Sequence, residues 1–294
     1  MTQGHIAIRS LETMQEMVQV EELQLQVWPG SERDVVPGHI LITLAHNGGT
    51  LLGAFDGDEM VGFVLGFPGF EVENPEQEPT SLLKHCSHML GVAPDHQGSG
   101  IGMALKLAQR LEVATQGLQL ITWTFDPLLS KNAHLNIRRL GGLARTYVRD
   151  AYGAMRDDLN QGVASDRFLL EWWITSPRVI ARVQKSRELL DLANFLEAGA
   201  RKVNPAVLRH DDLLAPADSL EPIEGNLLLV EIPGDFEDIK RRDPALAVAW
   251  RGHTRYVFET AFAQGFIATD FVHLAEEKFP RSYYLLIQGE GTLG

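Results

Sequence analysis

A glycine-rich loop at residues 90–102 (LGVAPDHQGSGIG) carries the residue types best suited to ligand binding in this chain. It follows an apolar segment and precedes a helical pattern of apolar residues, so a strand, a loop and a helix start are predicted to meet there. Glycines let the backbone approach a ligand closely, and the free N–H groups of a first helical turn attract anions. The spacing therefore predicts a site for phosphate oxygens.

Two common phosphate-binding motifs do not fit this loop. A P-loop requires Lys and then Ser or Thr directly after its last glycine, whereas Gly102 is followed by Met103 and Ala104. A dinucleotide-binding fingerprint requires the spacing G-x-G-x-x-G, whereas the glycines here are Gly98, Gly100 and Gly102. The pattern that fits is Q/R-x-x-G-x-G/A, beginning at residue 97.

This pattern resembles the acetyl-coenzyme A loop of the GNAT N-acyltransferase superfamily. The elements predicted for residues 6–175, in the order β-α-α-β-β-β-α-β-α-β-β, also follow the order of that fold. The resemblance implies an α/β (α+β) architecture, with a mixed, mostly antiparallel sheet flanked by helices. We expect a GNAT-like, acyl-coenzyme A-binding catalytic domain over residues 1–175.

The resemblance also implies which residues bind the cofactor. The strand before the loop would pair with the pantetheine arm through its exposed backbone groups, and the loop amides would bind the pyrophosphate. An asparagine near the start of the helix predicted at residues 130–140 would lie beside the lower part of that arm. The expected cofactor-binding residues are Leu90, Val92, Gln97, Gly98, Ser99, Gly100, Ile101, Gly102 and Asn132. Acetyl-coenzyme A, or another acyl-coenzyme A, is the expected co-substrate, and no metal is implied.

The expected proton chemistry departs from the family pattern. Members often carry a tyrosine, as general acid, about four residues before the glycine that closes this helix, but this chain has Ile137 there. His88 and His85 are candidates for the general base, and their odd spacing predicts that they lie on opposite faces of one strand. Tyr152, expected on a strand at residues 143–152, is a candidate catalytic hydroxyl. A purely structural role is the alternative for each of these side chains.

The chain continues beyond the resemblance. The expected parts are a helix over residues 177–200 with a linker up to residue 225, and a β-α-β-β segment over residues 226–294. Asp243 as N-cap, Pro244 at the first helical position and Gly265 at the end mark the helix of this segment. Its element order repeats that of residues 119–175. It is therefore either a second copy of the distal half of a GNAT domain or an unrelated appendage.

Composition narrows the class of protein. The 294 residues include 26 Lys and Arg against 39 Asp and Glu, for a net charge of −13, which argues against nucleic acid or an anionic membrane as partner. The single cysteine, Cys86, excludes an internal disulfide. Since no signal peptide or transmembrane segment is evident, a soluble cytoplasmic protein is expected.

These observations lead to one expected function and one alternative. The first is an acyl-coenzyme A-dependent N-acyltransferase that moves acetyl from acetyl-coenzyme A to an amine by direct attack in a ternary complex. The acceptor would be a small-molecule amine or an amine of a protein or peptide, and the segment after residue 175 would cover the acceptor side or form a homodimer interface. The alternative is a non-catalytic acyl-coenzyme A-binding or sensory module.

Overall fold

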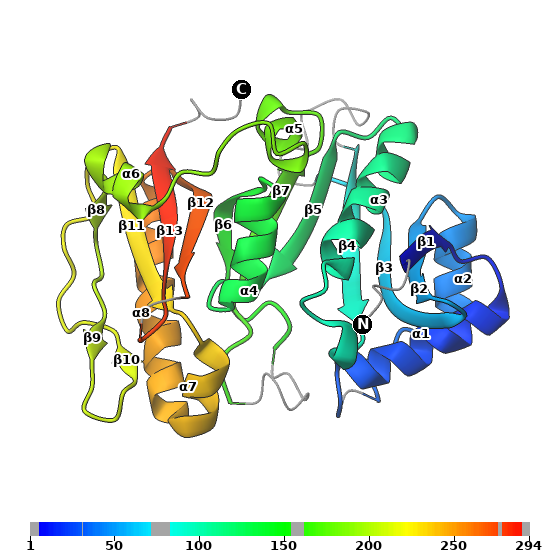
Figure 1. Cartoon of the computed structure of the whole chain (residues 1–294), viewed down its shortest axis with the longest axis horizontal. Coiled ribbons are helices and arrows are strands. Elements are labelled where there is room, and N and C mark those ends of the chain that lie inside the picture. Colours follow the sequence, from blue (N-terminus) through cyan, green and yellow to red (C-terminus); the bar gives the residue numbers. More distant parts are fainter. Residues whose placement is uncertain (1–5, 31, 72–82, 154–161, 276–277, 290–294) are drawn as a thin grey trace. The chain divides into compact units, whose positions relative to one another are not determined.

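The computed structural model describes residues 6–30, 32–71, 83–153, 162–275 and 278–289 (Figure 1). The chain divides into two compact units, the first formed by Met1–Trp123 with Arg156–Leu159 and the second by Thr124–Met155 with Asn160–Gly294. The first unit ends inside residues 1–175, the segment that we expected to form one domain. The domain assignment made from the sequence stays a prediction.

The first unit is a sheet with helices packed against it. Its elements are β1 (Ile6–Ser10), α1 (Met14–Val27), α2 (Gly38–His46), β2 (Thr50–Asp56), β3 (Glu59–Phe70), β4 (Leu83–Val92), the 3-10 turn η2 (Pro94–His96), α3 (Ile101–Thr115) and the first residues of β5 (Leu120–Phe125). The strand order is β1-β2-β3-β4-β5, and all neighbours are antiparallel except the parallel pair β4 and β5. A mixed, mostly antiparallel sheet flanked by helices confirms the predicted fold class.

Alternate side chains of β3 define the two faces of this sheet. Phe63 and Leu65 pack in one buried cluster with Met17 of α1, and Val64 packs in another with Leu105 of α3. Because successive strand residues point to opposite faces, α1 and α3 cover opposite sides of the sheet.

Local sequence signals set the ends of the elements around it. Thr13 and Glu16 form a capping box, so α1 begins at Met14, and Leu11 is buried in the core before the helix. Gly57 has a φ of +61° in the tight turn between the antiparallel strands β2 and β3, a backbone conformation that favours glycine.

A buried lysine lies between α3 and the sheet. Lys106 is 2% exposed, and its ammonium donates hydrogen bonds to Ser87 Oγ of β4 and to Gln109 Oε1, both at 2.9 Å. Its Nζ also lies 3.5 Å from the centre of the Trp123 ring on β5. Burial lowers the pKa of Lys106 well below its ordinary value because the charged form is poorly solvated there.

His85 completes this polar cluster from β4. Its Nε2 lies 3.1 Å from Thr50 Oγ1 and 3.4 Å from Gln109 Nε2, and its side chain is fully buried. Burial, with a further contribution from the charge of Lys106, lowers the pKa of His85 to about 4. The imidazole is therefore neutral in the folded protein near pH 7, and its position fits the structural role.

The second unit also contains a sheet with helices. Its elements are α4 (Ser130–Ala133), the π-helical turn η3 (His134–Arg139), β6 (Leu143–Val148), β7 (Arg167–Trp173), α5 (Pro177–Val183), α6 (Leu192–Glu197), β8 (Arg201–Lys202), β9 (Val207–Leu208), β10 (Leu214–Ala215), β11 (Leu227–Pro233), α7 (Phe236–Arg242), α8 (Pro244–Ala263), β12 (Phe266–Leu274) and β13 (Arg281–Gln288). Within this unit the strand order is β7-β6-β12-β13-β11-β8, and β9 and β10 form a separate hairpin.

The single helix predicted over residues 177–200 is wrong. The chain forms α5 and α6 instead, and Lys185 adopts a left-handed conformation with a φ of +53° just after α5. Leu189, on the apolar stripe of the predicted helix, is 37% exposed, and Asp191 starts α6 with a capping box. Residues 184–191 therefore find no core to pack against, which leaves the helical pattern without its main source of stability.

One strand and one helix start expected in the C-terminal segment lie where the sequence places them. The strand expected at residues 226–232 is β11, and α8 begins after Asp243, whose side chain accepts a hydrogen bond from the N–H of Leu246. β13 lies between β11 and β12, and β7 lies between β6 and the end of β5. In both segments, the last of the three strands lies between the other two. This arrangement is consistent with a repeat of the distal half-domain, and the repeat stays a prediction.

None of the described helices is both long and apolar enough to cross a membrane. In the same part of the chain, no three His, Cys, Asp or Glu side chains are grouped as metal ligands.

Replacement of Gly66 by alanine is expected to destabilise the first unit by roughly 1–3 kcal/mol, because the new Cβ has no room. It would lie 2.1 Å from His85 Nε2 and 2.8 Å from the carbonyl oxygen of Cys86. Gly69, on the same strand, has no atom within 4 Å of such a Cβ. Urea denaturation should therefore show a lower midpoint for Gly66→Ala than for Gly69→Ala. Equal midpoints would contradict the close packing assigned to Gly66.

Acid is expected to destabilise the first unit through His85. Because its pKa is about 4 in the folded protein and ordinarily 6.5, the unfolded chain binds the extra proton first as pH falls through 6.5. The resulting loss of unfolding free energy is absent above pH 7, reaches about 2 kcal/mol at pH 5 and levels off below pH 4. Denaturation midpoints at pH 7.5 and pH 5.0 should differ less for His85→Gln than for the wild type. His39→Gln, at an exposed histidine of α2, should retain the wild-type loss.

Candidate functional site

The two edges of β4 are paired to very different extents. Toward β3, the register runs from Leu83 opposite Phe70 to Val92 opposite Gly62. Toward β5, only two parallel positions pair, His85 with Ile121 and Cys86 with Thr122. Among the described residues of the first unit, the β4 edge that faces β5 therefore has no strand partner beyond residue 86. Its N–H and C=O groups are free to accept an added extended segment.

A bulge interrupts β4 where the two strands part. Met89 pairs with Leu65 and Ser87 with Gly66, so His88 is the extra residue of β4. The bulge reverses the alternation of side chains, so that His85 and Ser87 face α3, and Leu90 and Val92 also pack on the α3 side.

His88 lies on the opposite face from His85, as predicted. Its side chain is exposed, and its ring lies 6.1 Å from the ring of Phe67. Partial burial lowers the pKa of His88 below 6.5, so the imidazole is neutral near pH 7 and can accept a proton. Of the two histidines, only His88 is accessible to a substrate.

Beyond β4, the chain turns through the predicted loop into α3. Gly98 and Gly100 have φ values of +79° and +93°, and a Cβ on either would meet no atom within 4 Å. The Gln97 side chain donates to the carbonyl of Val92 at 3.3 Å, and the Ser99 hydroxyl donates to that of His96. The two polar side chains thus brace the loop, and open space adjoins its glycines.

The N-terminus of α3 is left without a protein cap. Gly100 is the N-cap residue, no side chain accepts from the first turn, and that turn contains no acidic residue. The first helical hydrogen bond runs from Ala104 N–H to the Gly100 carbonyl at 3.0 Å. The amides before Ala104 and the positive end of the helix dipole therefore favour an anion at this point. The Ile101 side chain is buried beside Leu105, so Ile101 and Gly102 contribute only backbone groups.

The helical face expected for α3 is only partly right. Leu111, expected on the buried apolar stripe, is 64% exposed, whereas Lys106 and Gln109 are buried. Burial of these two polar residues and the bulge at His88 were not predicted from the sequence. The one available signal was that Lys106 and Gln109, three residues apart, share a helix face with Val113.

Asn132 and the residues near it belong to the second unit. Asn132 is exposed on α4, and Ile137 is fully buried in η3, so a packed aliphatic side chain occupies the position where family members often carry tyrosine. Gly141, with a φ of +77°, ends the helix as expected. A Cβ on Gly142 would lie 2.7 Å from Leu170, which explains why no side chain is present there.

Tyr152 does not lie on the strand predicted for it. β6 ends at Val148, and Asp150 has a φ of +45°, which starts the turn that contains Tyr152. The phenol is 56% exposed, and its oxygen lies 2.6 Å from Thr124 Oγ1. An accessible hydroxyl is present, on a turn of the second unit.

The structure thus brings together one group of predicted residues. Leu90, Val92 and the loop at residues 97–102 form a continuous surface of the first unit, with His88 two residues earlier on β4. Asn132 and Tyr152 both lie in the second unit.

Comparison with known proteins gives a family and several related folds. Residues 13–134 match the model of the acetyltransferase (GNAT) family. Comparison with curated protein sequences gives no match.

Three solved structures illustrate the related folds. A putative GNAT acetyltransferase from Desulfovibrio desulfuricans is 21% identical, with a TM-score of 0.43, and the match covers 58% of this chain and 99% of that one. The ribosomal-protein-S18-alanine N-acetyltransferase of Escherichia coli is 18% identical, with a TM-score of 0.39 and coverage of 56% and 92%. Arabidopsis thaliana NAA60, solved with acetyl-CoA, is 13% identical, with a TM-score of 0.45 and coverage of 57% and 99%.

The family match spans α1 to α4 and so includes the open β4 edge, the glycine loop and the uncapped start of α3. Residues 13–134 of this chain therefore match an acetyltransferase (GNAT) domain.

Proposed function

We propose that this protein is an acyl-coenzyme A-dependent N-acyltransferase that transfers acetyl from acetyl-coenzyme A to an amine. The observation that carries the proposal is the open edge of β4, which leads directly to the uncapped N-terminus of α3. An extended arm with amide groups can pair with the open edge of β4, and a phosphate group can bind at the N-terminus of α3. Coenzyme A contains both parts in one molecule.

The fit to coenzyme A can be assigned residue by residue. The backbone groups of Leu90 and Val92 would pair with the pantetheine amides, and the amides of residues 97–102 would bind the pyrophosphate. The open space beside Gly98 and Gly100 leaves room for this close approach. Asn132 would contact the lower part of the cofactor arm, as the family resemblance implies. When bound, the co-substrate supplies an activated acyl group as a thioester.

Three steps would then fall to the residues of this chain. A base must take a proton from the attacking amine, and the neutral, accessible imidazole of His88 fits that role. A backbone N–H near the bulge would donate to the developing oxyanion. Tyr152 would donate a proton or a hydrogen bond to the departing thiolate, in place of the residue that Ile137 replaces. Direct attack in a ternary complex gains most from proximity, so it tolerates a weak acid.

The acceptor is proposed by chemical class alone. It is an amine of a small molecule or of a protein or peptide, and the net charge of −13 favours an acceptor that carries positive charge. Homodimer formation through the segment after residue 175, and a cytoplasmic location, belong to the same proposal.

The alternative is an acyl-coenzyme A-binding module without turnover. Burial of Ile137 at the usual position of the acid favours it, because the helix there cannot place a hydroxyl in the site. Both functions require cofactor binding, and only the transferase releases free thiol from acetyl-coenzyme A in the presence of an amine.

Gly100→Leu is expected to abolish stabilisation by coenzyme A, because the side chain would fill the space beside the loop amides. Gly117→Leu is the matched control, since Gly117 also has a positive φ, at the other end of α3, and an equally open environment. Both variants carry similar backbone strain, and only Gly100→Leu blocks the ligand. At 100 times its Kd, coenzyme A should stabilise the wild type and Gly117→Leu by about 2.7 kcal/mol in thermal denaturation. A full shift in Gly100→Leu would refute the loop assignment.

His88→Gln is expected to lower kcat roughly 10²- to 10⁴-fold, the usual contribution of general acid–base catalysis. Because His88 lies outside the loop, the coenzyme A-induced thermal shift should not change. Tyr152→Phe should give a smaller loss of kcat. The measurement is thiol release with acetyl-coenzyme A and a panel of amines. Cofactor binding without any thiol release in the wild type would instead support the binding module.

A further inference from the structure

An arginine cluster lies in the second unit where η3, α5 and β12 meet. We define it as Arg138 and Arg139 of η3 with Arg178 and Arg182 of α5. Arg138 Nη1 and Arg182 Nη2 donate to the two carboxylate oxygens of Asp270 on β12, at 3.2 Å and 2.5 Å.

Asp270 is the single carboxylate paired with the cluster among the described residues. Its Oδ1 also accepts from the N–H of Phe271 at 2.8 Å. Arg138 and Arg182 therefore share one carboxylate, and both of its oxygens are already occupied.

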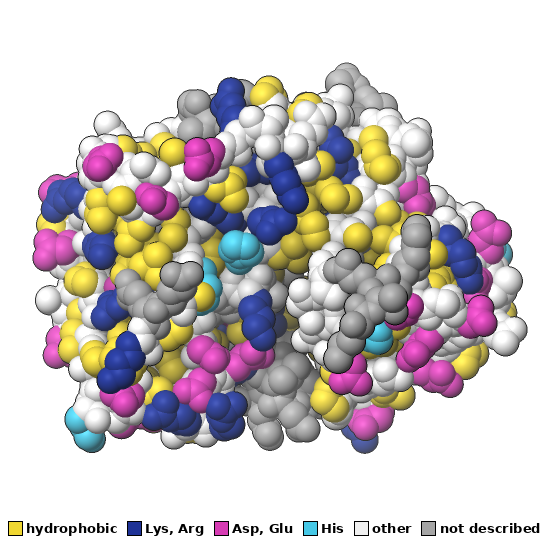
Figure 2. Space-filling model, viewed as in Figure 1, with side chains coloured by type: hydrophobic (Ala, Val, Ile, Leu, Met, Phe, Trp, Pro, Cys, Tyr) yellow, Lys and Arg dark blue, Asp and Glu magenta, His cyan; other side chains and the backbone are white. Residues whose placement is uncertain are grey.

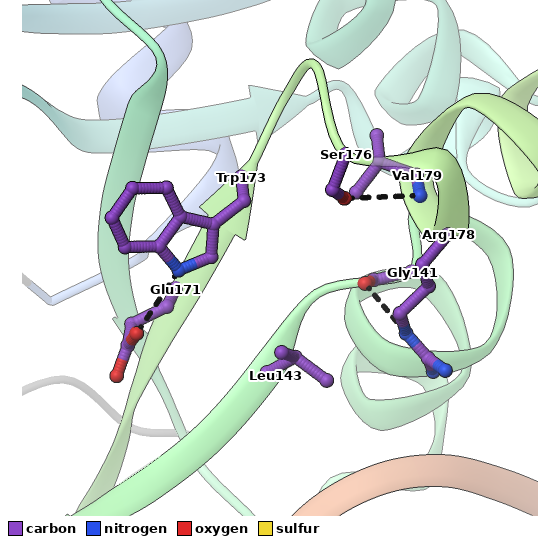
Figure 3. A pocket seen from close by; sticks show the side chains of 7 residues that line it. All are labelled: Gly141, Leu143, Glu171, Trp173, Ser176, Arg178 and Val179. Carbon is purple, nitrogen blue, oxygen red and sulfur yellow. Dashed lines mark hydrogen bonds between the residues drawn. The ribbon is translucent and has the colours of Figure 1, made fainter. Parts of the chain in front are cut away.

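The other two arginines are not neutralised by carboxylates. Arg178 donates from Nε to the carbonyl of Gly141 at 3.1 Å and from Nη2 to the carbonyl of Thr269. Figure 3 shows Arg178 turned to Gly141 at the rim of a small pocket. Arg139 forms no ion pair with any described residue. Carbonyl groups satisfy hydrogen bonds but leave the positive charge in place.

Two buried polar atoms of α5 and β12 lack a hydrogen-bond partner among the described residues. They are Nη1 of Arg182 and Oγ1 of Thr269, the residue before Asp270. Each can donate a hydrogen bond, and leaving a buried group of this kind unpaired is unfavourable. Two orphaned donors beside excess positive charge point to an absent oxyanion.

The electrostatic environment of His134 supports this reading. Burial lowers its pKa, and the charges of Arg139, Arg138 and His273 lower it further, against an opposing effect of Asp270. The potential at the edge of the cluster is therefore positive.

The excess of positive charge is local and contrasts with the negative net charge of the whole chain. Residues 130–142 and 176–187, which contain η3 and α5, include no Asp or Glu, although the net charge of the protein is −13. Figure 2 shows Lys, Arg and His side chains gathered over α4, η3 and α5. Elsewhere in this unit, Asp166 pairs with Arg255 and Glu231 with Arg281, whereas Asp126 pairs with both Arg167 and Arg251.

We propose that the arginine cluster binds the phosphate group of a small-molecule ligand. Four guanidinium groups against one carboxylate leave a net charge near three. A ligand carboxylate would compensate about one unit, whereas a phosphate monoester brings about 1.5 to 2 negative charges and a diphosphate more. Guanidinium groups also match phosphate oxygens in a bidentate geometry. The cluster belongs to the second unit and the glycine loop to the first, and the proposal does not rest on the proposed transferase activity.

The test is isothermal titration calorimetry with inorganic pyrophosphate at constant ionic strength. The full chain should bind it, and Arg139→Gln and Arg182→Gln should each weaken binding roughly tenfold or more. Arg139→Gln breaks no ion pair of the described structure, so its fold, checked by circular dichroism, should be intact even if Arg182→Gln unfolds. Arg201→Gln is the control, because Arg201 lies in an exposed pair with Glu224.

Gly100→Leu separates this site from the glycine loop. Pyrophosphate binding should persist in that variant. Three results would overturn the proposal: no binding to the wild type, unchanged affinity in folded Arg139→Gln, or loss of binding in Gly100→Leu.

Discussion

The proposed chemistry depends on the way in which β4 is paired. One of its edges is bonded to β3 along the whole strand, whereas the other is bonded to β5 at His85 and Cys86 alone. The first set of bonds fixes the strand, and the short second set leaves a row of unpaired backbone groups. That row ends at the loop that starts α3, so one backbone path offers both a strand edge and a helix N-terminus.

Polar contacts between α3 and β4 hold the open strand edge in place, and burying these polar groups costs free energy. Lys106 and Gln109 of α3 bond to Ser87 just where the pairing with β5 ends, and His85 joins them in a neutral form. Burying an amine and an imidazole disfavours their charged forms, so the cluster makes the fold sensitive to pH. In return, specific hydrogen bonds fix α3 and β4 relative to each other in the first unit. An apolar contact would fix their spacing less specifically.

Features with a local cause could be predicted from the sequence, and those that depend on distant partners could not. Gly100, Gly141 and the Asp243–Pro244 helix start were found because backbone conformation and capping are short-range effects. The bulge at His88 depends on the register with β3, which no local signal fixes. Similarly, the break between α5 and α6 and the turn at Tyr152 follow from where the core ends. Burial of Lys106 depends on Ser87 of β4 and on the Trp123 ring of β5.

The central claim is that coenzyme A binds along the open edge of β4 and at the start of α3. Amide hydrogen exchange, measured with and without coenzyme A, tests it most directly because the N–H groups on the open edge of β4 and in the first turn of α3 lack a strand or cap partner. The account predicts that added coenzyme A slows exchange at residues 87–92 and 98–103, while β1 and β2 are unchanged. Unchanged exchange in both segments at saturating coenzyme A, or protection confined to the second unit, would contradict it.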